Sequence, residues 1–114
     1  MPQRLFVITE ADRVHIAELF LSDTLDVMEF DQINEGLLKA VDLDPAGRWV
    51  LDLTATTYMG SAVLGLLVNI RQRIKQAKGQ LTLCGLSPRL EQIFRACCME
   101  RLFTIVKSRP DAIN

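Results

Sequence analysis

The feature that most constrains the fold of this chain is the alternation of short apolar runs with longer stretches of helical periodicity. Two apolar runs open the chain, at residues 5–9 and 14–21, and only the polar segment 10–13 separates them. Because so short a connection implies a hairpin, we expect these two strands to be antiparallel. From there on, strands alternate with helices, which predicts a mostly parallel sheet with helices packed on it.

The first helix and the third strand follow from apolar spacing. Apolar side chains recur at helical intervals over residues 27–41, and Asp26 with Glu29 three positions later resembles a capping box. The largely apolar run 48–53 predicts a strand that is buried on both faces, as in a parallel sheet covered by helices. The polar loop 54–60 then leads from the end of this strand to the next helix.

The second half of the chain repeats this pattern. A helix is expected from Ser61 to about Lys78, and a fourth strand at residues 80–85. Ser87 followed by Pro88 is typical of the start of a third helix. The order β-β-α-β-α-β-α-β predicts an α/β fold with a mixed sheet of four or five strands and three or four helices. The third helix has a predicted buried stripe of Leu90, Ile93, Phe94 and Cys97. A last strand is expected at residues 101–106, followed by a surface tail at 107–114 with room for a helical turn.

The composition fits a single domain over residues 1–114 and argues against several function classes. A hydrophobic content of 49% is enough for a packed core. The 14 acidic and 13 basic residues nearly cancel, which argues against nucleic-acid binding. The longest apolar stretch, residues 62–68, is far shorter than the ~20 residues of a membrane span, and residues 1–10 lack a signal pattern. We therefore expect a cytoplasmic protein without membrane insertion.

Cysteine and histidine are too few and too scattered to predict a metal centre or a disulfide framework. The cysteines Cys84, Cys97 and Cys98 include no CxxC pair, and His15 is the only histidine. We expect buried or half-buried reduced thiols. The sequence lacks both GxGxxG and GxxxxGK[ST], so no cofactor is predicted. The helix start at residues 85–89, beside an arginine, is a weaker candidate for an anion site.

Two catalytic arrangements are incomplete in this sequence. A serine hydrolase would need a GxSxG elbow, which is missing, and His15 as its base. A phosphoacceptor at Asp52 would need an acidic pair near the first strand to hold Mg²⁺, and that segment offers only Glu10. We therefore predict no catalytic residue, no enzyme activity, and a local hydrogen-bonding role for Asp52 at the end of its strand.

The junction between the third strand and the second helix holds the best candidate site. Serine is a preferred N-cap, so the simplest expectation for Ser61 is that it caps the helix. A helix start also accommodates a phosphate, whose added charge of about −1.5 to −2 would repel a docked partner. The first turns of this helix are apolar nearly all round, and they form either an exposed docking patch or part of the core. The residues concerned are Ala62, Val63, Leu66 and Leu67.

Three segments carry a family resemblance: LDVMEF with INEGLLKAV after the hairpin, WVLDLTATTYMGSAVLGLL at the junction, and QLTLCGLSPRL after it. Together with the strand order, they resemble the STAS domain family, the bacterial anti-sigma-factor antagonists and their relatives, over nearly the whole chain. The family pattern at the junction is approximately D-L-S-x-V-x-x-I-D-S-S-G-L-G-x-L. The matching positions are Asp52, Leu53, Ser61, Leu64, Gly65 and Leu67.

The resemblance implies a function and a site. In the family, the serine that matches Ser61 is phosphorylated by a partner that is both an anti-sigma factor and a serine kinase; the unphosphorylated form binds this partner and the phosphorylated form releases it. The sequence departs from the family where Asp, Ser and Gly are replaced by Gly60, Ala62 and Val63, and in the preceding loop at residues 23–26. The docking surface that the resemblance implies consists of Thr56, Thr57, Tyr58, Met59, Gly60, Ala62, Val63 and Leu66.

Two functions are compatible with these observations. The first is a protein-binding regulatory module that binds an anti-sigma factor or serine kinase and is released by phosphorylation of Ser61. The alternative is a STAS module that does not switch, acting as a scaffold, a small-ligand domain or an accessory of lipid transport; Gly60 and Val63 favour it somewhat. The sequence leaves open whether the chain forms a homodimer.

Overall fold

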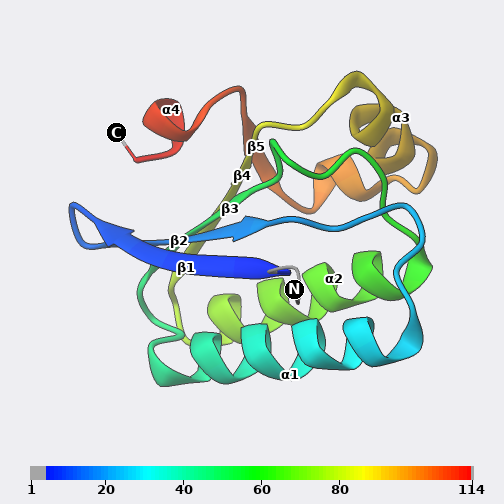
Figure 1. Ribbon diagram of the computed structural model, residues 1–114. Coiled ribbons are helices and arrows are strands. Elements are labelled where there is room, and N and C mark those ends of the chain that lie inside the picture. Colours follow the sequence, from blue (N-terminus) through cyan, green and yellow to red (C-terminus); the bar gives the residue numbers. More distant parts are fainter. Residues whose placement is uncertain (1–4, 114) are drawn as a thin grey trace.

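The computed structural model describes residues 5–113, which form a five-stranded mixed sheet (Figure 1). The strand order is β1-β2-β3-β4-β5; the β1–β2 pair is antiparallel and the other pairs are parallel. The predicted α/β fold and its order β-β-α-β-α-β-α-β are confirmed. Residues 1–4 and Asn114 of the predicted domain lie outside the described residues. The elements are β1 (Phe6–Ala11), β2 (Val14–Leu19), α1 (Val27–Leu43), β3 (Arg48–Asp52), α2 (Ser61–Gln76), β4 (Gln80–Cys84), α3 (Pro88–Ala96), the 3₁₀ helix η1 (Met99–Arg101), β5 (Thr104–Val106) and α4 (Arg109–Ile113).

One face of the sheet carries the main core. Alternate side chains of the strands, such as Leu19 and Leu51, point to this face, because the side-chain period of a strand is two. They pack against the buried stripe of α1, which includes Ile33 and Leu37, and against α2 and α3. Figure 1 shows α1 and α2 side by side below the sheet. Burial of these apolar stripes gives the main stabilisation of the fold.

The start of α1 is fixed by the predicted capping box. Asp26 Oδ1 accepts a hydrogen bond from Glu29 N at 2.7 Å, and Glu29 Oε1 accepts one from Asp26 N at 3.1 Å. Two backbone donors that lack partners within the helix are thereby satisfied. This cap sets where α1 begins, next to the loop that follows β2.

The opposite face of the sheet is covered by the C-terminal segment, which the sequence predicted to be a surface tail. The tail forms α4, and Ala112 is buried with Val14, Ile16, Val50 and Cys84 in a second apolar cluster. Figure 1 shows α4 on the side of the sheet away from α1 and α2. The predicted helical turn in this tail is confirmed, but the expected place at the surface is wrong for Ala112, because a central parallel sheet needs cover on both faces and α4 supplies it here.

The cysteines only partly match their prediction. Cys84 is buried, and burial, together with the nearby charge of Asp52, raises the pKa of its thiol to about 11. Cys97 and Cys98 are exposed, so the prediction of buried or half-buried thiols is wrong for both. The reason is that α3 ends at Ala96, so Cys97 does not extend its buried stripe. Within residues 5–113, no helix combines the length and the apolar character that crossing a bilayer requires.

Candidate functional site

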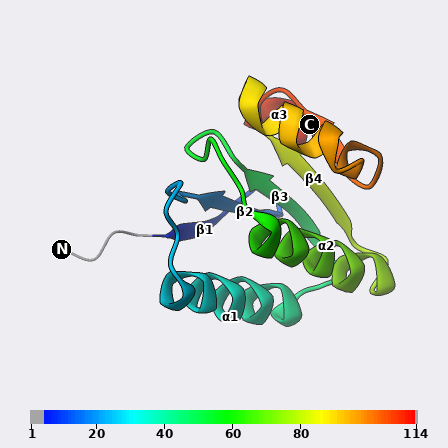
Figure 2. The same ribbon diagram turned by 90° about the vertical axis from the view of Figure 1, so that its right-hand side faces the viewer.

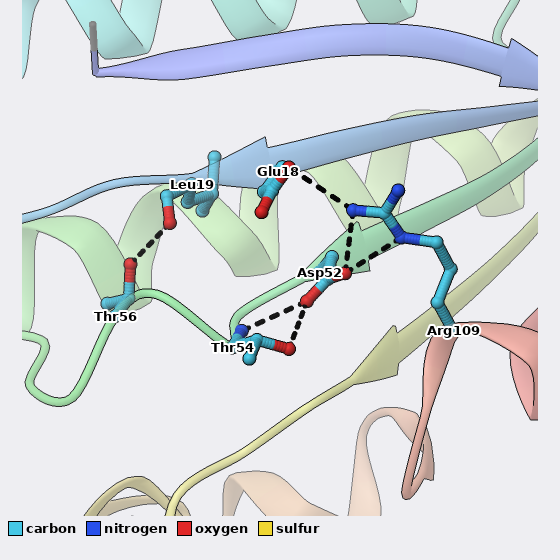
Figure 3. A network of polar contacts seen from close by, with 6 residues as sticks. All are labelled: Glu18, Leu19, Asp52, Thr54, Thr56 and Arg109. Atoms are coloured by element: carbon cyan, nitrogen blue, oxygen red, sulfur yellow. Dashed lines mark hydrogen bonds and ion pairs between the residues drawn. The ribbon is translucent and has the colours of Figure 1, made fainter.

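The loop that leads from β3 to α2 begins with a fixed turn at the end of β3. Thr54 donates to Asp52 Oδ1 twice, from its backbone N at 3.0 Å and from Oγ1 at 2.6 Å (Figure 3). The predicted local role of Asp52 is thereby confirmed. Gly85, directly after the end of β4, packs closely against this turn. A Cβ atom at Gly85 would lie only 2.2 Å from Thr54 Oγ1.

Thr56 fixes the same loop at a second point. Its side chain is fully buried, its Oγ1 donates to Leu19 O at 2.8 Å, and it accepts from Leu21 N at 3.1 Å. Figure 3 shows Thr56 reaching from the loop to the end of β2. With Thr54 and Thr56 both bonded, the chain before α2 is held against the carboxyl edge of the sheet. The position of the α2 start therefore follows from the sheet itself.

We expect Thr56→Val to lower the free energy of unfolding by about 2 kcal/mol, because it leaves a buried N–H and a buried C=O without their partner. Valine has nearly the same shape as threonine, so packing is retained. The matched control is Thr56→Ser, which keeps the hydroxyl and should lose less. Urea unfolding followed by circular dichroism measures both; equal losses in the two variants would contradict the role given to the hydroxyl.

Asp52 also connects this turn to the C-terminal segment. Its second oxygen, Oδ2, is 2.9 Å from Nε and 2.8 Å from Nη2 of Arg109, and Nη2 is 3.2 Å from Glu18 Oε1 (Figure 3). Burial alone would raise the pKa of Asp52, but the hydrogen bonds from Thr54 and the adjacent Arg109 hold it below its usual value. The sequence did not predict this role of Arg109. Arg109 lies 57 positions after Asp52, and only the folded structure brings the two side chains together.

Ser61 is the first residue of α2 and its side chain is exposed. The residue in the N-cap position is Gly60, with φ −83° and ψ 176°, and no side-chain hydrogen bond caps the helix. The prediction that Ser61 is the cap is therefore wrong by one position, since the backbone is already helical at Ser61. A glycine cap leaves the first amides of α2 without a side-chain acceptor. Ser61 Oγ has no hydrogen-bond partner among residues 5–113, so it is accessible to chemistry from outside.

The structure divides the predicted docking residues into two groups. Val63, Leu66 and Leu67 in the first turns of α2 are part of the core, so the alternative of an exposed apolar patch is wrong for these three; only Ala62 of that set is exposed. The reason is that these turns lie among the sheet, α1 and side chains of α3, and all of these remove them from solvent. The buried group is Thr56, Met59, Val63, Leu66 and also Leu67. The accessible group is Thr57, Tyr58, Gly60, Ser61 and Ala62.

A largely apolar groove lies beside Ser61, between the loop after β2, the first turn of α1 and the end of the loop before α2. Its volume is about 260 Å³, and Asp23 and Asp26 are among its lining residues, as are Tyr58 and Ala62 of the accessible group. Val27, which also lines it, is 76% exposed, and this contribution of α1 was missed. The sequence did offer a sign of this contribution, since the apolar Val27 directly follows the capping residue Asp26.

The weaker sequence candidates have structural partners. Ser87 Oγ accepts from Leu90 N at 3.2 Å as a helix cap, and Arg89 Nη1 is 3.2 Å from Asp23 Oδ2, so the segment proposed for an anion is engaged within the chain. His15 lies between Glu10 and Asp44, at 2.8 and 2.7 Å. In the part of the chain that the structure describes, no three metal-ligating side chains cluster.

Comparison with known proteins places this architecture in a family. The STAS domain family model matches residues 7–112. The chain belongs to the STAS domain family. The STAS domain is 32% identical over 65 residues to a putative anti-sigma factor antagonist, BtrV, of Bordetella bronchiseptica, a match that covers 57% of this chain and 56% of that protein. It is 31% identical over 87 residues to an anti-sigma-B factor antagonist of Listeria monocytogenes, covering 76% of this chain and 75% of the relative.

Solved structures share the fold of this STAS domain. An anti-sigma-factor antagonist domain from Planctomyces limnophilus has a TM-score of 0.83 at 23% identity, over 95% of this chain and 94% of that one. The Bacillus cell fate determinant SpoIIAA in its phosphorylated form has a TM-score of 0.69 at 18% identity, over 95% of this chain and 96% of that one. At these identities the likeness establishes the fold alone.

Proposed function

We propose that this STAS domain acts in the cytoplasm as an antagonist of an anti-sigma factor that is also a serine kinase, and that phosphorylation of Ser61 ends the interaction. The observation that supports this most is the placement of Ser61. It is an exposed hydroxyl without a partner among the described residues, directly after a loop fixed by two threonines, and its chain neighbours Gly60 and Ala62 line an apolar groove. Relatives that are named anti-sigma factor antagonists agree with this function.

The proposed switch needs no refolding of the domain. The contacts of Thr54 and Thr56 hold the loop before Ser61, so a phosphate added to Ser61 stays beside the groove. The uncapped amides at the start of α2 and the helix dipole favour its negative charge there. Asp23, which pairs with Arg89, and Asp26 already line the groove, so about −1.5 to −2 further charges make the net charge of this surface negative. A partner that docks apolar side chains there would have to desolvate these charges.

Phosphate transfer tests the site. With ATP and an anti-sigma kinase from the same genome, the wild type should gain one phosphate and Ser61→Ala none, as measured by intact-protein mass spectrometry. The matched control is Ser22→Ala, which removes an exposed serine that itself lines the groove next to Ser61. Loss of phosphate uptake in Ser22→Ala, or uptake by Ser61→Ala, would contradict the assignment.

Binding tests the release step. We expect the phosphorylated wild type and Ser61→Asp to bind the kinase at least tenfold more weakly than the unphosphorylated protein, or about 1.4 kcal/mol. Ser61→Ala should bind like the wild type, because the partner loses only one hydroxyl. Isothermal titration calorimetry gives the three affinities, and equal values for all of them would refute release by charge.

The apolar groove also suits the alternative of a module that does not switch. Its volume of about 260 Å³ next to exposed Val27 would hold a small apolar ligand or one side chain of a scaffold partner. In that case Ser61→Asp would keep full partner affinity and no phosphate would be gained with any kinase of the genome. Val27→Asp, in contrast, would weaken binding under both functions.

A further inference from the structure

A second groove lies at the opposite end of α2, over the start of β4. We name it the β4 groove; its volume is about 410 Å³. Its walls are the last turns of α2 and the segment between η1 and β5, and Figure 2 shows β4 running between α2 and the segment after α3. Its accessible lining includes Arg71, Lys75, Gln80, Leu81, Leu102 and Thr104.

The charge of the β4 groove has one sign. Among residues 5–113, Arg71 and Lys75 are the only charged residues that line it, although acidic residues outnumber basic ones in the whole sequence. None of the 14 acidic residues falls between Leu53 and Leu90, the stretch that contains α2 and β4. Lys78 and Arg101, which directly precede lining residues, are exposed as well. A ligand that fits this groove electrostatically is acidic.

The sheet is open at the same place. β4 begins at Gln80, but β5 pairs only with residues 82–84. Gln80 N donates to Gly47 O at 3.0 Å on the β3 side, so the N–H of Leu81 points to the β5 side, because successive residues of a strand alternate. The carbonyl of Leu102, which would continue the ladder, accepts a hydrogen bond from Arg71 Nε instead. The β4–β5 pairing begins at Thr82, and among residues 5–113 no backbone hydrogen bond joins the Leu81 N–H to the turn before β5, which leaves a donor for an added strand.

We infer that the β4 groove binds an acidic, extended segment of a partner protein, which adds to the open start of β4. Backbone bonding to Leu81 supplies the strand contact, the half-buried Leu81 and the exposed Leu102 take up alternate apolar side chains, and Arg71 and Lys75 pair with the acidic ones. Lys75 lies 14 positions after Ser61, which is about 21 Å along the helix, so this site is separate from Ser61.

The test uses an acetylated hexapeptide that alternates glutamate and valine, added to the ¹⁵N-labelled protein. We expect chemical-shift changes at the amides of Leu81, Thr82 and Thr104, and binding that weakens as salt is raised. Lys75→Glu should weaken binding at least tenfold. The matched control is Lys39→Glu, the same charge change on the exposed side of α1, which should bind within twofold of the wild type.

Several outcomes would overturn this inference. They are a dissociation constant weaker than about 1 mM, equal binding of a lysine-valine peptide, an equal loss in Lys39→Glu, and shift changes that arise from self-association without peptide. Ser61→Asp should bind the peptide like the wild type. A failed phosphorylation test therefore leaves this site standing, and a failed peptide test leaves the proposed switch standing.

Discussion

Gly85→Ala is expected to lower the free energy of unfolding by about 3 kcal/mol, because two costs add at this position. The backbone of Gly85 has φ +75°, which L-residues with a side chain adopt only with strain. The new Cβ would also lie 2.2 Å from Thr54 Oγ1 and 3.0 Å from Thr54 N, so Thr54 must move and weaken its bonds to Asp52. Urea denaturation followed by circular dichroism measures the loss.

The matched control for this prediction is Gly65→Ala, which adds the same methyl group within α2. No atom of residues 5–113 lies within 4 Å of a Cβ at Gly65, leaving aside its chain neighbours and the nearby backbone of α2, and alanine is the better helix former by about 0.8–1 kcal/mol. Gly65→Ala should therefore stabilise the protein. Opposite signs for the two variants would support the close approach of the strand ends, and a loss below 1 kcal/mol in Gly85→Ala would argue against it.

Asp52→Ala is expected to cost about 3 kcal/mol at neutral pH, since it removes a buried carboxylate that accepts two hydrogen bonds from Thr54 and pairs with Arg109. Glu18→Ala is the matched control, because it removes the other carboxylate beside Arg109, which is more exposed than Asp52. An exposed pair of this kind contributes less than about 1 kcal/mol. Equal losses of unfolding free energy in both variants would contradict the larger contribution that we assign to the contacts of Asp52.

The pH dependence of unfolding in the wild type and in Asp52→Ala gives a second test of the role of Asp52. The pKa of Asp52 is lowered in the folded protein, so its stabilisation is complete above the unfolded pKa of about 3.9 and is lost as the pH falls through the folded value. The difference in unfolding free energy between wild type and Asp52→Ala should therefore shrink below about pH 4. A difference that stays constant down to pH 2 would contradict the charged role of Asp52.

The contacts around Asp52 also connect the C-terminal segment to the loop that precedes the proposed switch. One oxygen of Asp52 holds Thr54 at the start of the loop to Ser61, and the other holds Arg109 at the start of α4. Loss of Asp52 should thus loosen both the cover of the second sheet face and the loop before α2. The phosphorylation assay applied to Asp52→Ala would show whether the kinase depends on this order.

The sequence by itself determined the order of strands and helices, the antiparallel hairpin and the cap at Asp26. These depend on periodicity and on residues close together in the chain, which a sequence displays directly. It also located the junction at Ser61, because the end of an apolar strand and the start of a helix adjoin there.

Only the tertiary structure decided which side chains of this junction are accessible. Val63 and Leu66 look like candidates for an apolar patch, but burial depends on which elements cover a helix, and residues distant in the chain supply that cover. The same reason applies to Arg109, which meets Asp52 across 57 positions, and to the tail, which becomes α4 because the sheet has a second face to bury. The Ser61 hydroxyl does not cap α2 because the helix begins one residue earlier than a serine cap requires, and this is a property of the backbone at Gly60.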